Sequence, residues 1–277
     1  MTPPLNLAVL GAGYIGRAFA SAAVRNGHHV WAVRRSAVAP LNDGVTWLRG
    51  DIAHGVIEGL PETLDAIVLT VAPSGRGDGY DETYPPAASA AMSLAVSHHA
   101  NRVLYTSSTG VYGGREGTWV TEQSPRLGVS GSNEALIRAE DIVMGPRDVG
   151  ATVFRVSGIY GPERDPRGRM QHASALAQRG EYWVNLAHRD DIVSAMLHTL
   201  GLDQAPAVLN ISDGSPTRAA DVARWLAARR GEDPATLIFS NADQRSRNDQ
   251  RVSNAALVAT GWLPAFPSFR EGFSGGL

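Results

Sequence analysis

A glycine-rich turn near the amino terminus has the residue spacing of a dinucleotide-binding site. Gly11, Gly13 and Gly16 form Gly-x-Gly-x-x-Gly, with an apolar run before the turn and a helical segment after it. The first glycine would permit a tight bend, the second would let a pyrophosphate approach the backbone, and the third would let the helix pack against a sheet. N–H groups at the start of the helix would face the phosphates. The alternative is a glycine turn without a ligand.

Two adjacent arginines, Arg34 and Arg35, follow the second expected strand, and no acid lies beside them. NAD sites usually place a carboxylate there for the ribose 2′-hydroxyl, whereas a guanidinium suits the 2′-phosphate of NADP. The pair therefore favours NADP(H) over NAD(H), unless both are solvated surface residues. Asp51, after the third expected strand, could bind the adenine amino group or cap its own loop.

Candidate groups for proton transfer are few, because the chain contains no lysine and all 25 of its basic side chains are arginine. Tyr112 has a phenol whose ordinary pKa is about 10, so without a neighbouring cation it stays neutral, and it could simply pack in a loop. Ser132 could relay a proton or cap a helix that begins near Asn133. His188 titrates near neutrality, but the family resemblance described below favours a structural role for it.

The elements that would position these residues alternate between strands and helices. Apolar runs predict strands at residues 5–10, 29–33, 45–48, 65–71, 102–107, 152–156 and 207–211, and helices are predicted at 13–26, 83–99, 133–144, 190–200 and 217–230. This order argues for an α/β fold with a doubly wound parallel sheet (a Rossmann fold) and a smaller C-terminal substrate lobe. We expect the dinucleotide-binding domain to span residues 1–160, with 182–211 returning to it, and the lobe to comprise 161–181 and 212–277.

Composition narrows the class of protein. The 277 residues are 43% hydrophobic and 19% charged, which is typical of a soluble globular protein, and a net charge of −2 gives no indication of nucleic acid or membrane binding. The absence of cysteine excludes disulfides, thiolate zinc sites and a cysteine nucleophile. We expect no metal site, and we expect a cytoplasmic protein because no secretory leader is evident.

Several motifs occur in a characteristic order, and with them the chain resembles the extended short-chain dehydrogenase/reductases. More narrowly, it is similar to the atypical members of the NAD(P)-dependent epimerase/dehydratase branch, and the resemblance covers most of the chain. The matching motifs are Gly11–Gly16, 50–52, 65–68, 107–113, 155–162 and 188–191.

The resemblance implies that Ser108 faces the substrate. Typical members carry the motif Tyr-x-x-x-Lys, whose lysine lies four residues before a glutamate. Alignment on Glu140 puts Leu136 at the lysine and Ser132 at the tyrosine. The usual phenol–ammonium pair is therefore missing. Ser108, Tyr112 and Ser132 are the candidate catalytic residues. The expected cofactor contacts are Gly11, Gly13, Tyr14, Ile15, Gly16, Arg34, Arg35, Asp51, Ile52, Val71, Ala72, Ser107 and Ser157. Relatives commonly pair through helices equivalent to 83–99 and 133–144, which suggests a homodimer.

These features predict an NADP(H)-dependent oxidoreductase or epimerase/dehydratase-like enzyme with non-standard proton transfer. Its substrate would be small and polar or sugar-derived. The alternative is an NADP(H)-binding sensor without turnover, which the missing pair favours. A hydroxyacid-type dehydrogenase is a third interpretation, against which the 107–113 and 155–162 motifs argue. Arg245, Arg247 and Arg251 could bind the diphosphate of a nucleotide-sugar or form a solvated loop.

Overall fold

The computed structural model describes most of the 277-residue chain. The described residues are 3–36, 42–54, 57–73, 78–114, 116–128, 130–145, 148–164, 180, 182–229, 231–237, 239 and 249–274.

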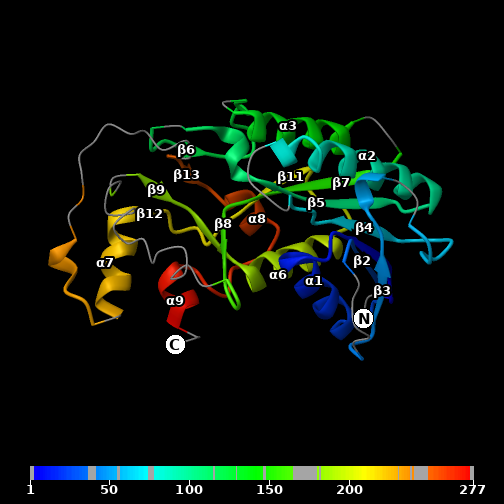
Figure 1. Cartoon of the computed structure of the whole chain (residues 1–277), viewed down its shortest axis with the longest axis horizontal. Helices are drawn as coiled ribbons and strands as arrows, with labels where there is room; N and C mark the ends of the chain where they lie inside the picture. The colour runs from blue at the N-terminus through cyan, green and yellow to red at the C-terminus, as the bar shows by residue number, and fades with distance from the viewer. Residues whose placement is uncertain are drawn as a thin grey trace. The chain divides into compact units, whose positions relative to one another are not determined.

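A seven-stranded sheet with the order β11-β7-β5-β4-β1-β2-β3 forms the centre of the fold (Figure 1). Its strands are β1 (Asn6–Leu10), β2 (His29–Arg34), β3 (Val45–Arg49), β4 (Ala66–Leu69), β5 (Arg102–Ser108), β7 (Gly150–Val156) and β11 (Val208–Ile211). Strand β1 pairs in parallel with both β2 and β4, β2 with β3, and β4 with β5. The order of the strands along the chain reverses between β1 and β4, which confirms the predicted doubly wound sheet and defines its switch point.

Helices cover both faces of this sheet. Helix α1 (Tyr14–Arg25) lies on one face, and α2 (Tyr84–Ser97) and α3 (Gly131–Met144) lie side by side on the other (Figure 1). Helix α2 buries small side chains, which let it approach the sheet closely. Its buried residues are Ala87, Ala88, Ala91, Met92 and Ala95. They belong to the main core cluster, together with Leu10, Ile67, Leu69 and Tyr105.

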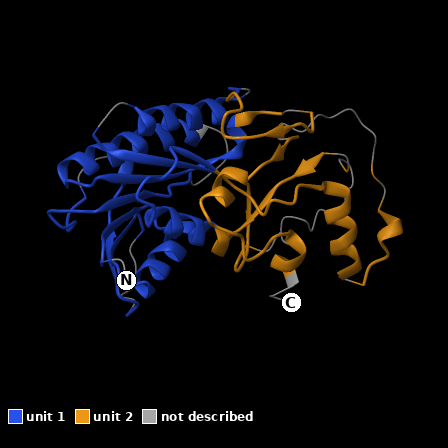
Figure 2. Cartoon of the chain, turned by 180° about the vertical axis from the view of Figure 1, so that it is seen from behind, with its two compact units in different colours: residues 1–111, 127–155, 192–209 blue, residues 112–126, 156–191, 210–277 orange. Residues whose placement is uncertain are grey.

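The described chain divides into two compact units (Figure 2). Unit 1 comprises Met1–Val111, Leu127–Arg155 and Ile192–Leu209, and unit 2 comprises Tyr112–Arg126, Val156–Asp191 and Asn210–Leu277. Helix α6 (Arg189–Leu200) and the 3-10 turn η3 (Thr109–Tyr112) each contribute residues to both units. The functional division into a cofactor domain and a substrate lobe stays a prediction.

Unit 2 contains three two-stranded sheets, β10–β8, β12–β9 and β13–β6. Their strands are β6 (Trp119–Val120), β8 (Gly158–Tyr160), β9 (Trp183–Val184), β10 (Leu186–His188), β12 (Thr217–Arg218) and β13 (Arg251–Val252). Within its described residues unit 2 also contains the helices α7 (Ala219–Arg229), α8 (Ala255–Ala259) and α9 (Phe269–Ser274). Val222 and Leu226 of α7 pack with Phe269 of α9 in a separate small core. Among the described residues, no helix combines the length and apolar character needed to cross a bilayer.

Helix α3 starts two residues earlier than the sequence predicts, at Gly131. Its N-cap is Ser130, which has extended backbone angles and a side chain that accepts from the Asn133 N–H. The alternative role predicted for Ser132, as the cap of this helix, is therefore wrong. Both serines precede the same apolar pattern, so the sequence alone could not choose between them.

Alanine substitutions of the two serines will separate these positions. We expect Ser130→Ala to lower the free energy of unfolding by about 1 kcal/mol, because it removes the cap of α3. Ser132→Ala should change it by less than about 0.5 kcal/mol. Urea unfolding of both variants measures the difference, and equal losses would contradict the assignment of the cap to Ser130.

Candidate functional site

The turn between β1 and α1 leaves no room for side chains at two of its glycines. Gly11 has a φ of +88°, and a Cβ there would lie 2.8 Å from backbone atoms of Val71. A Cβ on Gly16 would lie 2.5 Å from Oγ1 of Thr70, whose hydroxyl donates to the Gly11 carbonyl at 2.9 Å. The Gly11 N–H donates to the carbonyl of Val33 at 3.1 Å. Gly11 and Gly16 therefore have the backbone geometry and packing of a dinucleotide-binding turn.

The middle glycine of the turn, Gly13, has space beside it. Among the described residues, the nearest atom to a Cβ on Gly13 would be the Gly11 carbonyl oxygen, 3.8 Å away. Gly13 is also the N-cap of α1, so no side chain caps this helix, and its first turn carries no acid. The N–H groups and the positive end of the helix dipole therefore suit a phosphate. Contacts from Gly13, Tyr14 and Ile15 to a cofactor stay predictions.

Three arginines lie close together at the carboxyl ends of β2 and β3. Arg34 pairs in register with Arg49, and Nε of Arg49 donates to the carbonyl of Arg35 at 3.3 Å. Nε of Arg34 donates to the hydroxyl of Ser36 at 3.0 Å. Arg35 and Arg49 are exposed and Arg34 is half-buried. The sequence identified Arg34 and Arg35 but missed Arg49, because its proximity depends on the pairing register of two strands.

The other predicted adenosine contacts lie on the loops after β3 and β4. Oδ1 of Asp51 accepts from the Ala53 N–H at 3.2 Å, which is the loop-capping alternative, and adenine binding by Asp51 stays a prediction. Ile52 is buried in the core of unit 1, so it could reach a cofactor only through its backbone. Val71 packs against the same core, and Ala72 is exposed.

The two serines at the end of β5 have different hydrogen-bond roles. The hydroxyl of Ser107 is buried and donates to Oε1 of Glu140 at 2.7 Å. Ser108 is half-buried, and its Oγ accepts from the Gly110 N–H at 3.1 Å. This bond uses a lone pair of Ser108 and leaves its hydroxyl proton, so Ser108 can still donate to a substrate oxygen.

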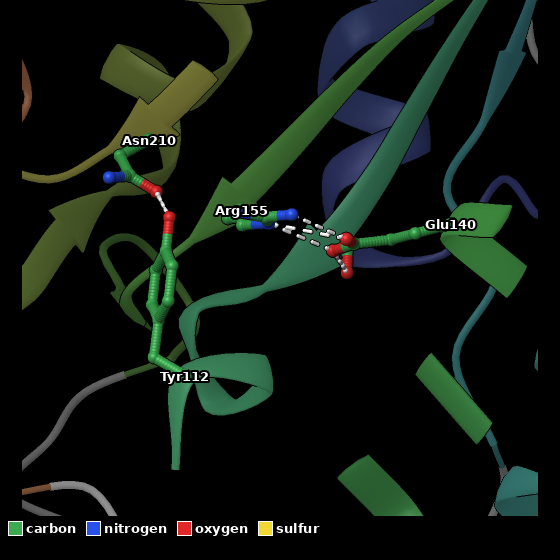
Figure 3. Close-up of polar contacts among 5 residues, drawn as sticks. Tyr112, Glu140, Arg155 and Asn210 are labelled. Atoms are coloured by element: carbon green, nitrogen blue, oxygen red, sulfur yellow. Dashed lines mark hydrogen bonds and ion pairs between the residues drawn. The ribbon is translucent and has the colours of Figure 1, made fainter. Parts of the chain in front are cut away.

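The carboxylate that accepts from Ser107 also forms a buried ion pair, between Glu140 and Arg155 (Figure 3). Arg155 of β7 donates through Nη2 to Oε2 of Glu140 at 2.8 Å, and through Nε to both carboxylate oxygens at 3.1 and 3.2 Å. The side chains are 4% and 0% exposed, respectively. The sequence placed both residues in matching motifs but did not predict that they pair. Their contacts connect β5, α3 and β7 inside unit 1.

The contacts of Ser132 do not make it a replacement for the missing base. Oγ of Ser132 lies 3.3 Å from Oγ of Ser130, whose hydroxyl donates to Oδ1 of Asn133 at 2.7 Å. An amide oxygen does not take up a proton near neutral pH, so this contact makes no proton relay. Leu136, at the position of the family's lysine, is buried.

Tyr112 is fully buried in unit 2 and is held by a structural hydrogen bond. Its hydroxyl donates to Oδ1 of Asn210 at 2.7 Å (Figure 3), and the Asn210 N–H donates to Oε1 of Glu122 at 2.8 Å. The phenol is therefore buried and hydrogen-bonded, in line with the packing alternative, and a catalytic role for Tyr112 stays a prediction.

His188 is also a structural residue of unit 2. Its Nδ1 accepts from the Asp190 N–H at 3.2 Å, and its ring lies against Phe266 at 3.9 Å between centroids. Burial lowers the pKa of His188, so the ring is neutral near pH 7. The neighbouring Asp191 accepts from the N–H groups of Ala265 and Phe266 at 2.8 and 3.0 Å, which is an anchoring role.

Two further predictions concern unit 2. The Ser157 N–H donates to the carbonyl of Ile211 at 3.0 Å, and among the described residues its buried hydroxyl has no partner, so a cofactor contact stays a prediction. Arg251 lies between the rings of Trp119 and Trp183, 5.2 and 5.0 Å from their centroids. Arg245 and Arg247 lie outside the described residues. Within the described part of the chain, no group of three His, Cys, Asp or Glu residues could hold a metal ion.

Comparisons with known proteins identify the family of this chain. Residues 7–212 match the model of the NAD dependent epimerase/dehydratase family. The protein YeeZ of Escherichia coli K12 is 31% identical over 218 residues, which covers 74% of this chain and 76% of that protein. The chain therefore belongs to the NAD-dependent epimerase/dehydratase family, as the resemblance predicted.

Solved structures have the same fold. The solved structure of a Methylobacillus flagellatus protein, assigned by name to the NAD-dependent epimerase/dehydratases, is 25% identical to this chain with a TM-score of 0.77. The match covers 99% of this chain and 97% of that protein. MoeE5 in complex with UDP-glucuronic acid and NAD is 22% identical with a TM-score of 0.78, covering 97% and 96%. At that identity the second comparison supports the fold alone.

Proposed function

We propose that this protein binds a nicotinamide dinucleotide on unit 1 and acts as an oxidoreductase or epimerase/dehydratase-like enzyme. Its substrate would be small and polar or sugar-derived. The observation that carries the proposal is the turn formed by Gly11, Gly13 and Gly16 at the switch point of the sheet. Two of these glycines tolerate no side chain, and the third leaves space beside an uncapped helix start.

Ser108 is the residue best suited to contact the substrate. Its hydroxyl proton can be donated to a carbonyl or hydroxyl oxygen, because the Gly110 N–H occupies only an acceptor position of its oxygen. A bound nicotinamide would supply hydride exchange at its C4 atom. Ser132 and Leu136 provide neither a base nor a cation, so the proton would come from water or from the substrate.

We propose NADP(H) as the cofactor on the basis of the arginines at the ends of β2 and β3. Three guanidinium groups, those of Arg34, Arg35 and Arg49, would favour a 2′-phosphate over a bare ribose hydroxyl. NAD is the second candidate, since the family is described as NAD-dependent and a solved structure of the same fold contains NAD.

Titration of NADPH and NADH, followed by nucleotide fluorescence, tests the cofactor. We expect NADPH to bind more tightly, and Arg34→Gln to weaken NADPH binding by roughly 10- to 100-fold while leaving NADH binding unchanged, since it removes a charge-assisted contact to the 2′-phosphate. Arg25→Gln is the matched control, because Arg25 is an exposed arginine in the last turn of α1. A preference for NADH would refute the NADP assignment, and no binding of either nucleotide would refute the whole proposal.

Turnover distinguishes the enzyme from the second candidate, a sensor that binds NADP(H) without reaction. The substitution of both usual proton-transfer residues, by Ser132 and Leu136, favours the sensor. UDP-glucose, UDP-glucuronic acid, dTDP-glucose and simple aldehydes and ketones would be screened for a change in nicotinamide absorbance or in the sugar. If the protein binds nucleotide but converts none of these compounds, the sensor becomes the better description.

A further inference from the structure

The hydroxyl of Ser108 is oriented by the short turn η3 that follows it. The Gly110 N–H donates to Oγ of Ser108 at 3.1 Å, so the orientation of that oxygen depends on where Gly110 lies. On the other side of the Gly110 Cα, its carbonyl accepts from Nδ2 of Asn133 at 2.5 Å. Asn133 of α3 therefore fixes the position of Gly110, and Gly110 in turn donates to the Ser108 hydroxyl.

Asn133 is itself fixed at both ends of its side chain. It occupies the third position of α3, where its backbone N–H donates to the carbonyl of Ser130 at 2.9 Å. Its Oδ1 accepts from the Ser130 hydroxyl at 2.7 Å. Exchange of the amide oxygen and nitrogen would place Oδ1 against the Gly110 carbonyl, so the hydrogen bonds permit only one orientation of this side chain.

We propose that Asn133 is a positioning residue for Ser108. It fixes Gly110, and through Gly110 it aims the Ser108 hydroxyl at the substrate. The role proposed for Asn133 is positioning, because its two side-chain hydrogen bonds to described residues go to Gly110 and Ser130. Reaction rates depend steeply on the placement of reacting groups, and a displacement of about 1 Å can cost 100-fold. This proposal rests on the proposed function only for the part that concerns turnover.

The structural part can be measured without a substrate. Hydrogen exchange followed by mass spectrometry, on the full chain, is expected to be at least fivefold faster for amides of the segment 108–112 in Asn133→Ala than in wild type. Asn133→Asp should behave similarly, because it keeps the acceptor for Ser130 but loses the donor to Gly110. Glu134→Ala is the matched control: Glu134 is the exposed next residue of the same helical turn, and its loss should leave the segment unchanged.

The functional part is a double-mutant cycle on the compound that the turnover screen identifies. We expect Asn133→Ala to lower kcat about tenfold, with KM and nucleotide affinity changed less than twofold. Combined with Ser108→Ala, it should cause no further loss, because Asn133 acts through Ser108.

Each outcome of these measurements decides the proposal. Unchanged hydrogen exchange at 108–112 in Asn133→Ala overturns the proposal. Faster exchange with an unaltered kcat also overturns it. So does a double variant in which the losses from Asn133→Ala and Ser108→Ala add fully. If the wild type converts none of the compounds, the proposed enzymatic function fails, while the exchange data still decide whether Asn133 holds the Ser108 turn.

Discussion

Glu140→Gln is expected to lower the free energy of unfolding by roughly 3–5 kcal/mol, one of the two largest effects that we expect of a single side chain. The substitution keeps the shape of the side chain but removes the negative charge that pairs with the buried guanidinium of Arg155. The Ser107 hydroxyl would also lose a charged acceptor at 2.7 Å. Urea unfolding of the variant, followed by circular dichroism, measures the loss.

Three further variants identify the source of that effect. Arg155→Met should be about as destabilising as Glu140→Gln, because it removes the guanidinium that pairs with the buried carboxylate of Glu140. The double variant Glu140→Leu with Arg155→Met should lose much less than the sum of the two single losses, since both charges of the pair are removed together. Arg138→Met is the matched control, because Arg138 lies on the same helix as Glu140 and pairs with Asp81, which lies outside that helix. Both side chains of this pair are more than half exposed, so its loss should cost less than about 1 kcal/mol. A loss below about 1 kcal/mol in Glu140→Gln would contradict the prediction.

The fold could be predicted from the sequence wherever an element was long and its burial was regular. Strands such as β1 and β4 are continuous apolar runs, and α1 ends just before Gly27, which has a φ of +85°. The strands of unit 2 could not be predicted, because two or three residues carry no detectable period. The pairing of Arg251 with Trp119, for example, joins residues far apart in the sequence.

In the candidate site, too, features formed by neighbouring residues were predicted and contacts between distant residues were missed. The glycine turn was predicted because its geometry follows from residues that are neighbours in sequence. Three contacts were missed, because each depends on how separate elements pack. They are the pairing of Arg34 with Arg49, the ion pair of Glu140 with Arg155, and the hydrogen bond from Asn133 to the Gly110 carbonyl. Asn133 stands three residues after the N-cap Ser130, where a capping box would carry Glu or Gln, so no recognised sequence signal pointed to it.

Asp213→Asn is expected to stabilise the protein above pH 7 by up to roughly 4 kcal/mol and to have little effect near pH 4. Asp213 follows β11 and is 5% exposed. Burial raises its pKa from 3.8 to about 7. The hydrogen bond from the Ser215 N–H, at 3.0 Å, opposes the shift, and the carboxylates of Asp191 and Glu271 add to it. An asparagine keeps an oxygen that can accept from Ser215 but has no charge to bury.

The direction of this pH dependence follows from the pH at which Asp213 loses its proton in the folded and in the unfolded state. In the unfolded chain Asp213 ionises near pH 4, and in the folded protein near pH 7. Between these values the unfolded state releases a proton that the folded state still holds, so the contribution of Asp213 to stability falls as the pH rises from 4 to 7. Above pH 7 both states are ionised, and the folded protein bears the full cost of a buried carboxylate.

Unfolding midpoints in urea at pH 4, 5.5, 7 and 8.5 would test this, with the wild type and the variant compared at each pH. Asp233→Asn is the matched control, because Asp233 makes the same kind of bond, to the Ala235 N–H at 2.9 Å, from an exposed position in unit 2. The control should differ from wild type by less than about 0.5 kcal/mol at every pH. The gap between Asp213→Asn and wild type should instead widen with rising pH and level off above 7, since any strain from the amide is the same at all four values. A gap independent of pH would mean that the Asp213 carboxyl does not hold its proton in the folded protein.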